Sequence, residues 1–504
     1  MKKASVTANK NYHIASIDSR IYGSFLEHLG RAVYTGIYEP DHPTADDNGM
    51  RRDVVDLVRE LDTPVCRYPG GNFVSAYNWE DGIGPRDKRP TRLDLAWHTL
   101  ENNHVGIHEF ANWCELVNTE LMLAVNLGSR GLDAARNLLE YCNHPGGTTW
   151  SELRIANGRK DPWDIKLWCL GNEMDGNWQI GHKTADEYGR LAANTARAMK
   201  LYDKTIELVV CGSCGSEMPT FPEWDVTVLE HTYDLVNYIS LHSYFKNPEK
   251  HTGNFLALNH RVEEYIDTVA GVIAYVKEKK RSNHDVYIAF DEWNVWYHSR
   301  EESSKFLDGS QGWVHAPSLL EDIYNFEDVL QVGCILNSFI RRSNIVKIAC
   351  IAQLVNVIAP IMTEKAGKAW RQTIYYPLQL ASKYGRGKAL QLKTSSPSYN
   401  AKVGDNIPFL DISGVDNEDG VITFFAINRN GKERLDIDIS LEGFKNPKII
   451  GHITIHNDDI EAVNTVNDPD KVIPVKGTGT KIESGKVYAS FEPYSYHIIR
   501  VETN

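Results

Sequence analysis

The chain has 504 residues, of which 42% are hydrophobic and 24% are charged; this globular balance excludes a disordered, collagen-like or coiled-coil protein. Its net charge of −13 disfavours nucleic acid as a partner, because a negative field repels a polyanion. We expect no membrane contact, since no run approaches 18 uninterrupted apolar residues. Residues 1–10 show no apolar run typical of an export signal, so we expect a cytoplasmic protein.

Residues 17–384 alternate short apolar runs with helical patterns. The spacing of Val54, Leu57, Val58 and Leu61 predicts one helix, and the Thr184–Glu187 capping box predicts the start of another. Eight runs rich in Val, Ile and Leu are typical of strands in an enclosed parallel sheet: 21–25, 64–67, 121–126, 165–172, 206–211, 238–242, 286–292 and 348–356. Eight such repeats predict an α/β fold, a (β/α)₈ TIM barrel. The alternative fold is an open doubly wound sheet, but this sequence lacks the glycine-rich fingerprint that is typical of that fold.

Residues 385–504 show the pattern of an all-β domain. Residues 435–439 alternate apolar and polar side chains. Asp419-Gly420 and Asn430-Gly431 predict hairpin turns on either side of a strand at 421–428. We expect a jelly-roll-like β-sandwich, joined by the strand-like residues 1–16. No Pro/Gly/Ser-rich linker precedes it, so we expect it to pack on the barrel.

Two of the predicted barrel strands lead into a glutamate. Glu173 follows the fourth strand and Glu292 ends the seventh. Reactive groups of such barrels lie at the carboxyl ends of the strands, so both carboxylates should face one pocket. Two opposed carboxylates are the minimum set for glycoside hydrolysis, and Asn172 could bind the sugar hydroxyl next to the reacting carbon. Strand alternation predicts that Asp291 points away from this pocket.

Several segments resemble glycoside hydrolase family 51, the α-L-arabinofuranosidases, which are retaining enzymes. The resemblance covers essentially the whole chain. Its most distinctive segment is Arg-Tyr-Pro-Gly-Gly-Asn-Phe at 67–73, whereas Asn-Glu alone is shared with the wider clan of retaining barrel glycosidases. The other matching segments are Gly-Ser-Phe-Leu-Glu-His at 23–28, Gly-Asn-Glu at 171–173, Leu-His-Ser-Tyr at 241–244 and Asp-Glu-Trp-Asn at 291–294.

The resemblance implies a role for each matching position. Glu173 would be the general acid/base and Glu292 the nucleophile, with Arg67 pairing with Glu292 to keep it ionised. His242 would support the site, and Tyr244 would orient the nucleophile. The substrate-binding residues that the resemblance implies are Glu27, Asn72, Trp97, Asn172, Tyr244, Trp296 and Gln353. We expect no metal and no cofactor.

The function that we expect is exo-acting hydrolysis of terminal non-reducing α-L-arabinofuranosyl residues from arabinoxylan or arabinan oligosaccharides. Retention through a glycosyl-enzyme intermediate predicts two carboxyls roughly 5 Å apart, with the pKa of Glu173 raised by nearby negative charge. Two alternatives stay open: a related retaining β-xylosidase or endoglucanase, and a carbohydrate-binding protein that has lost catalysis. The resemblance also implies a homo-oligomer, a hexamer, and the sequence does not fix the linkage preference.

Overall fold

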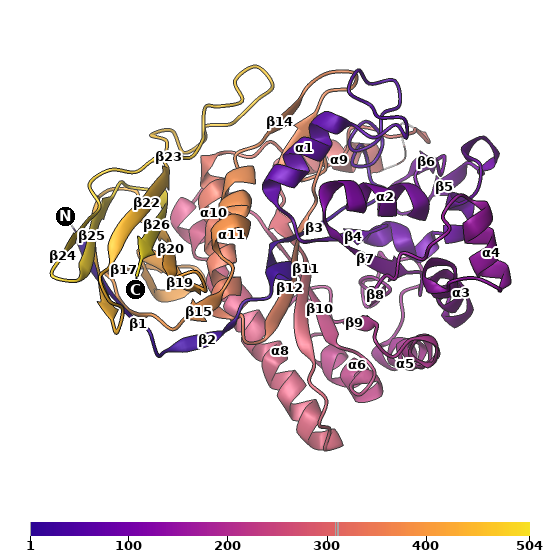
Figure 1. The fold of residues 1–504 in the computed structure, drawn as a ribbon, viewed down its shortest axis with the longest axis horizontal. Helices are drawn as coiled ribbons and strands as arrows, with labels where there is room; N and C mark the ends of the chain where they lie inside the picture. The colour runs from indigo at the N-terminus through magenta and orange to yellow at the C-terminus, as the bar shows by residue number, and fades with distance from the viewer. Residues whose placement is uncertain (1, 308, 310–311, 504) are drawn as a thin grey trace.

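The computed structural model describes residues 2–307, 309 and 312–503, which form a closed barrel with a β-sandwich beside it (Figure 1). Eight parallel strands follow one another around the barrel in chain order, which confirms the predicted (β/α)₈ architecture. They are β3 (Gly23–Phe25), β4 (Val65–Tyr68), β7 (Glu120–Val125), β8 (Leu167–Leu170), β9 (Glu207–Cys211), β10 (Tyr238–Phe245), β11 (Tyr287–Val295) and β12 (Val346–Ala352).

Helices surround the barrel strands, and both helices predicted from local signals are present. The first buries Val54, Val58 and Leu61, and in the second the Thr184 hydroxyl and the Glu187 carboxylate cap each other's backbone. The helices are α1 (Arg52–Leu61), α2 (Ile107–Val117), α3 (Leu132–Asn143), α4 (Thr149–Ala156), α5 (Ala185–Tyr202), α6 (Glu223–Thr232), α7 (Thr252–Leu256), α8 (Asn259–Lys280), α9 (Arg300–Leu307), α10 (Phe326–Arg341) and α11 (Tyr375–Tyr384). Among the described residues, no helix combines the length and apolar character needed to cross a membrane.

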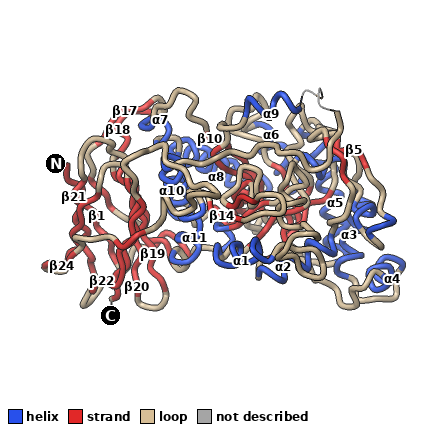
Figure 2. Tube along the Cα trace, turned by 90° about the horizontal axis from the view of Figure 1, so that it is seen from above, coloured by secondary structure: helices blue, strands red, loops and turns tan. Residues whose placement is uncertain are grey.

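The sandwich consists of two sheets that enclose a separate apolar core (Figure 2). The outer sheet runs β16 (Lys393–Ser395), β1 (Lys2–Asn9), β21 (Leu435–Glu442), β25 (Lys486–Phe491) and β24 (Lys481–Glu483). The inner sheet runs β2 (His13–Ser16), β15 (Lys388–Leu390), β19 (Leu410–Asn417), β20 (Val421–Asn428), β26 (Ser495–Glu502), β22 (Lys448–Ile455) and β23 (Val475–Lys476). The inner sheet packs on α10, so the sandwich lies against the barrel as expected.

Three two-stranded pairs complete the described strands: β5 (Arg92–Asp94) with β6 (Thr99–Glu101), β13 (Ile361–Thr363) with β14 (Ala369–Arg371), and β17 (Ser398–Ala401) with β18 (Gly404–Pro408). The N-terminal β1 pairs along its whole length with β21, and β2 pairs with β15. We therefore propose a barrel domain at 17–384 and a sandwich domain at 385–504 that includes residues 1–16. Residues 1 and 504 themselves lie outside the described part.

One of the two predicted hairpins of the sandwich is wrong. The Asp419-Gly420 turn does connect the paired strands β19 and β20. The Asn430-Gly431 turn instead carries the chain from β20 in the inner sheet to β21 in the outer sheet, because β20 already lies between β19 and β26. A glycine is needed there for close packing, since a Cβ at Gly431 would lie 2.2 Å from the ring of Tyr494.

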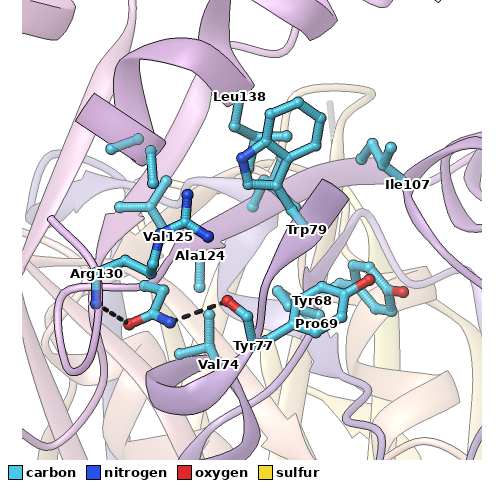
Figure 3. Close-up of a pocket in the computed structure, with 14 residues that line it drawn as sticks. Tyr68, Pro69, Val74, Tyr77, Trp79, Ile107, Ala124, Val125, Arg130 and Leu138 are labelled. Carbon is cyan, nitrogen blue, oxygen red and sulfur yellow. Dashed lines mark hydrogen bonds between the residues drawn. The ribbon is translucent and has the colours of Figure 1, made fainter. Parts of the chain in front are cut away.

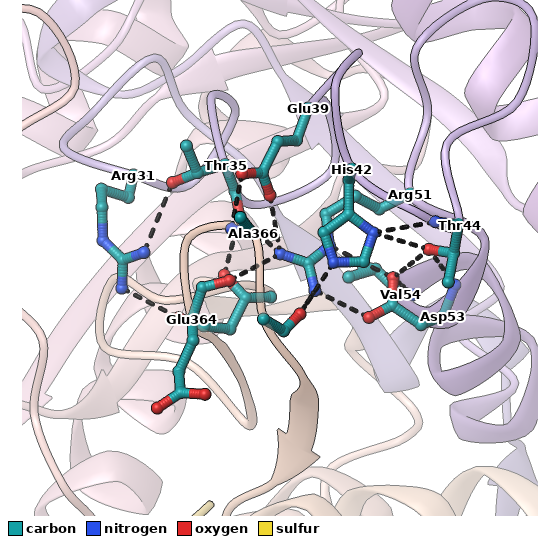
Figure 4. A network of polar contacts seen from close by, with 12 residues as sticks. Arg31, Thr35, Glu39, His42, Thr44, Arg51, Asp53, Val54, Glu364 and Ala366 are labelled. Atoms are coloured by element: carbon teal, nitrogen blue, oxygen red, sulfur yellow. Dashed lines mark hydrogen bonds and ion pairs between the residues drawn. The ribbon is translucent and has the colours of Figure 1, made fainter.

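A buried arginine fixes two of the loops at the carboxyl end of the barrel. Arg51 is 0% exposed and lies between the loop after β3 and the β13–β14 hairpin that follows β12 (Figure 4). Its guanidinium donates to Glu39 Oε2 at 2.9 Å, to Asp53 Oδ2 at 2.7 Å and to the carbonyls of Glu364 and Gly367 at 3.0 and 2.8 Å. Because a buried charge must be fully paired, this network holds both loops in one arrangement at the mouth of the barrel.

An apolar pocket lies between β7, α3 and the segment after β4, with Tyr68, Val74, Trp79 and Leu138 among the side chains that line it (Figure 3). At its edge Asn126 Nδ2 donates to the Tyr77 carbonyl at 2.9 Å. Neither Glu173 nor Glu292 lines this pocket. This pocket is therefore not the place where the two carboxylates meet.

The sandwich contains a buried histidine pair that makes its stability depend on pH. His497 is 3% exposed, its Nδ1 lies 3.0 Å from His452 Nε2, and its ring stacks on Phe491 at 3.8 Å. Burial, together with the neighbouring His452, lowers the pKa of His497 well below its ordinary value of 6.5. Below pH 6.5 the unfolded chain therefore binds a proton at this histidine that the folded chain does not bind. The free energy of unfolding is not reduced by His497 above pH 6.5, and it decreases as the pH falls below that value.

Because the unfolded chain is protonated at His497, we expect the free energy of unfolding to be about 1.4 kcal/mol lower at pH 5.5 than at neutral pH. Calorimetric Tm values at pH 7.5 and 5.5 measure the effect for the wild-type chain. The His497→Gln variant keeps a polar side chain without the titration and should lose less Tm over the same interval. An equal loss in both proteins would show that His497 does not contribute.

Candidate active site

The two predicted glutamates meet at the carboxyl end of the barrel. Glu173 lies on the turn after β8, where Gly171 and Glu173 adopt positive φ values of 91° and 46°. Glu292 lies within β11 and is 7% exposed. A carboxylate oxygen of each glutamate and a ring nitrogen of His242 all lie within 4.8 Å of one another. Two carboxyls at this separation suit nucleophilic attack, since inverting enzymes keep theirs about 6.5–9.5 Å apart to admit a water.

The carboxylate of Glu292 is held from two sides. Arg67 Nη1 on β4 donates to its Oε2 at 2.9 Å, and the Tyr244 hydroxyl on β10 donates to its Oε1 at 2.6 Å. Both partners were expected beside this residue from the resemblance. The two hydrogen bonds fix the orientation of the Glu292 carboxylate, as an attacking group requires.

The expected orientation of Asp291 is wrong because β11 contains a bulge. Ser240 pairs with Ala289 and His242 pairs with Glu292, so two residues of β11 stand opposite one residue of β10. The extra residue breaks the alternation of side chains. Asp291 consequently points into the barrel, as Glu292 does, and its Oδ2 lies 3.2 Å from Arg67 Nε.

Glu173 receives hydrogen bonds from His242 and Trp178. His242 Nδ1 lies 2.9 Å from its Oε1, and Trp178 Nε1 donates to its Oε2 at 2.9 Å. Burial raises the pKa of Glu173, and the charge of Glu292 raises it further, while the contacts with His242 and Trp178 oppose that shift. The raised pKa was expected, although burial and not negative charge is its first cause.

His242 carries a positive charge in this site. Burial lowers its pKa, but the charge of Glu292 and hydrogen bonds with Asp291 and Glu173 outweigh burial and raise the pKa to about 10. The imidazolium therefore lies between the two catalytic candidates, with Nδ1 at 2.9 Å from Glu173 Oε1 and 3.7 Å from Glu292 Oε2. It partly neutralises two acids in a buried pocket.

Glu27 is fixed by three neighbours at the end of β3. Its Oε1 accepts from the Phe73 amide at 2.9 Å and from Trp97 Nε1 at 3.0 Å. Gln353, expected to contact sugar, also binds Glu27: its Oε1 accepts from the Glu27 amide at 3.0 Å, and its Nε2 donates to Glu27 Oε2 at 3.4 Å. Burial raises the pKa of Glu27 to about 8. Its carboxyl is thus mostly protonated at pH 7 and able to donate to a hydroxyl.

Glycines let these acids approach the chain after β4. A Cβ at Gly70 would lie 2.6 Å from Glu27 Cγ, and a Cβ at Gly71 would lie 3.3 Å from Glu292 Oε2. This glycine pair therefore lets the backbone after β4 approach the two acidic side chains closely. Any other residue would push Glu27 away from the pocket.

Some polar atoms around the carboxylates have no protein partner among the described residues. Asn172 accepts from Arg67 Nη2 at 2.5 Å through its Oδ1, but its buried Nδ2 has no hydrogen-bond partner, and neither does the buried Nε1 of Trp296. The Trp296 ring meets that of Tyr244 edge-to-face at 5.1 Å. Asn72 starts a short 3₁₀ helix and is half-buried. A buried donor without a partner costs free energy, so the Asn172 amide is available to a ligand.

The described residues contain one group of side chains with potential metal ligands at suitable separations: Glu173, His242 and Glu292. These are the two catalytic candidates and the imidazolium between them. A metal ion would need a ring nitrogen without a proton, and the raised pKa of His242 disfavours that form at neutral pH.

Two contributors to the site were not anticipated from the sequence. Trp178 is 51% exposed and donates a hydrogen bond to Glu173. Its position in the loop after β8, close to Glu173 in the sequence, was the only signal that could have indicated this role. Asp291 could be found only by predicting the bulge, and the sequence pattern of β11 carries no glycine that would mark one.

Comparison with known proteins agrees with this geometry. The model of the α-L-arabinofuranosidase 1 domain matches residues 57–267, and that of the α-L-arabinofuranosidase C-terminal domain matches residues 291–495. The chain is 53% identical to an intracellular exo-α-(1→5)-L-arabinofuranosidase 1 of Bacillus subtilis, with 100% of this chain and 99% of the relative covered. It is 46% identical to an exo-α-(1→6)-L-arabinofuranosidase of Bifidobacterium longum, covering 100% and 98% of the two chains.

A solved structure of a family 51 α-L-arabinofuranosidase from Bifidobacterium longum superimposes with a TM-score of 0.94 at 41% identity, and the match covers 99% of each chain. These matches cover the full length of the chain at identities well above 30%, so they include the barrel, the sandwich and the loops between them. The chain belongs to glycoside hydrolase family 51, the α-L-arabinofuranosidases.

Proposed function

We propose that this protein is a retaining exo-α-L-arabinofuranosidase in which Glu292 is the nucleophile and Glu173 the general acid/base. The observation that carries the proposal is the approach of the two carboxylates to within 4.8 Å at the mouth of a family 51 barrel. Their environments differ in the way the two roles require. Glu292 is oriented by Arg67 and Tyr244, while burial raises the pKa of Glu173 and favours its protonated form.

The reaction then proceeds by double displacement. Glu173 donates its proton to the glycosidic oxygen while Glu292 attacks the anomeric carbon, and the sugar becomes an ester of Glu292. Glu173, now a carboxylate, takes a proton from water, which hydrolyses the ester with net retention. His242 contacts Glu173 throughout and stabilises the carboxylate form between the two steps. The free Nδ2 of Asn172 donates to the hydroxyl beside the anomeric carbon, and Glu27 and Asn72 bind the remaining hydroxyls.

The relatives suggest which substrates to test. The Bacillus subtilis protein is named for the α-(1→5) linkage and the Bifidobacterium longum protein for the α-(1→6) linkage. We infer that this chain acts inside the cell on short α-(1→5)-linked arabino-oligosaccharides, in line with the more similar relative. Family resemblance also supports a homo-oligomer, a hexamer, and light scattering of the purified protein would measure its mass.

We expect p-nitrophenyl α-L-arabinofuranoside to be hydrolysed, with the α anomer of arabinose as the first product in a proton NMR time course. Retention is required because each of the two displacements inverts the anomeric carbon. The matched p-nitrophenyl β-D-xyloside and β-cellobioside should react at least tenfold more slowly in kcat/KM, as a pocket built for a furanoside binds their transition states less well.

The outcomes separate the remaining hypotheses. Preference for the xyloside or the cellobioside would assign the protein to a related retaining glycosidase. Binding of arabino-oligosaccharides without turnover would identify a carbohydrate-binding protein. First release of the β anomer would contradict the nucleophilic role of Glu292.

A further inference from the structure

We propose that Asp291 is a positioning residue for catalysis: its single buried carboxylate holds both Arg67, which orients the nucleophile, and His242, which contacts the acid/base. This proposal rests on the proposed function for its catalytic meaning. The contact itself exists in the free enzyme and is testable there. The Asp291 carboxylate pairs with Arg67 and His242 and makes no hydrogen bond to either catalytic glutamate, so it acts through these two cationic neighbours.

The first branch runs from Asp291 to Glu292. Asp291 is 1% exposed, and its Oδ2 lies 3.2 Å from Arg67 Nε. The other two nitrogens of that guanidinium are used on the pocket side, where Nη1 donates to Glu292 Oε2 at 2.9 Å and Nη2 to Asn172 Oδ1 at 2.5 Å. The contact at Nε is an ion pair and not a hydrogen bond, because Nε has no hydrogen-bond partner among the described residues. The Asp291 charge therefore holds the Arg67 guanidinium at its Nε side, while its two terminal nitrogens bind Glu292 and Asn172.

The second branch runs from Asp291 to Glu173. Its Oδ1 accepts from the Ser240 hydroxyl at 2.5 Å and lies 3.5 Å from His242 Nε2, which is itself 3.1 Å from Ser240 Oγ. The opposite ring nitrogen, Nδ1, is 2.9 Å from Glu173 Oε1. In the imidazolium form Nε2–H faces Asp291 and Nδ1–H faces Glu173. The Asp291 carboxylate therefore orients the ring that contacts the acid/base.

The charges around His242 explain why this anion matters. The groups that face it are Glu173 on the turn after β8 and both Asp291 and Glu292 on β11, while Arg67 on β4 is the other cation of the cluster. Burial raises the pKa of the nearby thiols of Cys169 and Cys211, which keeps them neutral. With Asp291 neutralised, two buried cations would share one fewer anion, and His242 is the one that can release a proton.

The inference depends on the bulge in β11. In a regular strand the residue before Glu292 would face the helices, as Phe290 and Trp293 do when they pack on Phe339. The bulge places two successive acids inside the barrel, one at the reacting centre and one beneath it. A bulge beside an active site that re-aims a side chain is a recurrent structural feature.

The test is Asp291→Asn, which preserves shape and removes one charge. Protein with ring-¹⁵N-labelled histidine, without substrate, gives the titration midpoint of His242, assigned by its loss in His242→Asn. We expect the His242 midpoint to fall by at least one pH unit. We also expect kcat for p-nitrophenyl α-L-arabinofuranoside to fall by about 10²-fold while KM stays within threefold, because misplaced catalytic groups slow the chemical step more than they weaken binding. The control is Asp225→Asn, the same side-chain exchange at another fully buried aspartate outside the site. Burial raises the pKa of Asp225 to about 7, so this control tests the exchange of a buried carboxyl for an amide and not the loss of a full charge. That control should leave the His242 midpoint and the kinetics unchanged.

Two results would overturn the proposal. One is an unchanged His242 midpoint in folded Asp291→Asn protein. The other needs no variant: in the wild-type enzyme His242 must keep both ring protons at pH 8, and a midpoint near 6.5 would show that the anion does not hold it. If the midpoint shifts but no glycoside is hydrolysed, the Asp291 contact stands and the proposed function is wrong.

Discussion

Replacing Glu292 with alanine is expected to reduce kcat for p-nitrophenyl α-L-arabinofuranoside by about 10⁴-fold or more, because the covalent route loses its attacking group. Arg67 and Tyr244 then lose the carboxylate that they orient. In the proposed double displacement the vacated space is where the attacking group would approach the anomeric carbon. A small anion such as azide can occupy that space. We therefore expect azide to restore turnover and to form the glycosyl azide of inverted configuration, which NMR identifies as the β anomer.

The configuration of the azide product makes this experiment specific for the nucleophile. Azide that enters in place of Glu292 attacks the face opposite the leaving group, so only inversion is consistent with the assigned role. Glu264→Ala, which removes an exposed glutamate of α8 whose carboxylate pairs with Arg261, is the matched control and should keep the wild-type kcat. Full activity of Glu292→Ala without azide would show that another group attacks the sugar.

The barrel could be predicted because its strands are buried on both faces and therefore form short, uninterrupted apolar runs. The run at 286–292 matches β11 within a few residues, and that at 206–211 matches β9. The sandwich was harder, since a turn dipeptide such as Asn430-Gly431 reports only that the chain turns. Which sheet the next strand joins depends on whether β20 has a free edge, and that edge is occupied by β26, which lies about 70 residues further along the chain.

The same limit applies to the site. The positions of Glu173 and Glu292 could be predicted because each comes directly after a run of apolar strand residues, and the carboxyl ends of such strands must lie at the barrel mouth. Asp291 could not, because side-chain direction along β11 depends on a register shift against β10 that leaves no local mark. Gln353 was predicted to contact sugar, and in the structure its amide is bonded to Glu27, a partner 326 residues away. Contacts of this kind are fixed by the closure of the barrel and not by neighbouring sequence.

Glu173→Ala is expected to separate the two chemical steps. For α-(1→5)-linked arabino-oligosaccharides, which have poor leaving groups, we expect kcat/KM to fall by about 10²–10⁴-fold, the usual contribution of a general acid. For 2,4-dinitrophenyl α-L-arabinofuranoside, whose leaving group needs no proton, formation of the Glu292 ester should be nearly unaffected. Hydrolysis of the ester should become rate-limiting, so a burst of dinitrophenol precedes a slow steady state.

The pH profile of the same variant tests the electrostatic account of the site. Burial raises the pKa of Glu173, so wild-type kcat/KM should decline as the pH rises through that value and the acid loses its proton. In Glu173→Ala this alkaline decline should disappear for the dinitrophenyl substrate.

Azide should accelerate the slow step of Glu173→Ala, because it replaces the water that Glu173 would have activated. The product should be the glycosyl azide of retained configuration, opposite to the product of Glu292→Ala. A glycosyl azide of inverted configuration from both variants would contradict the assignment of Glu173 as the acid/base. Wild-type rates of Glu173→Ala on oligosaccharides would contradict it as well, because the carboxyl that His242 and Trp178 contact would then transfer no proton.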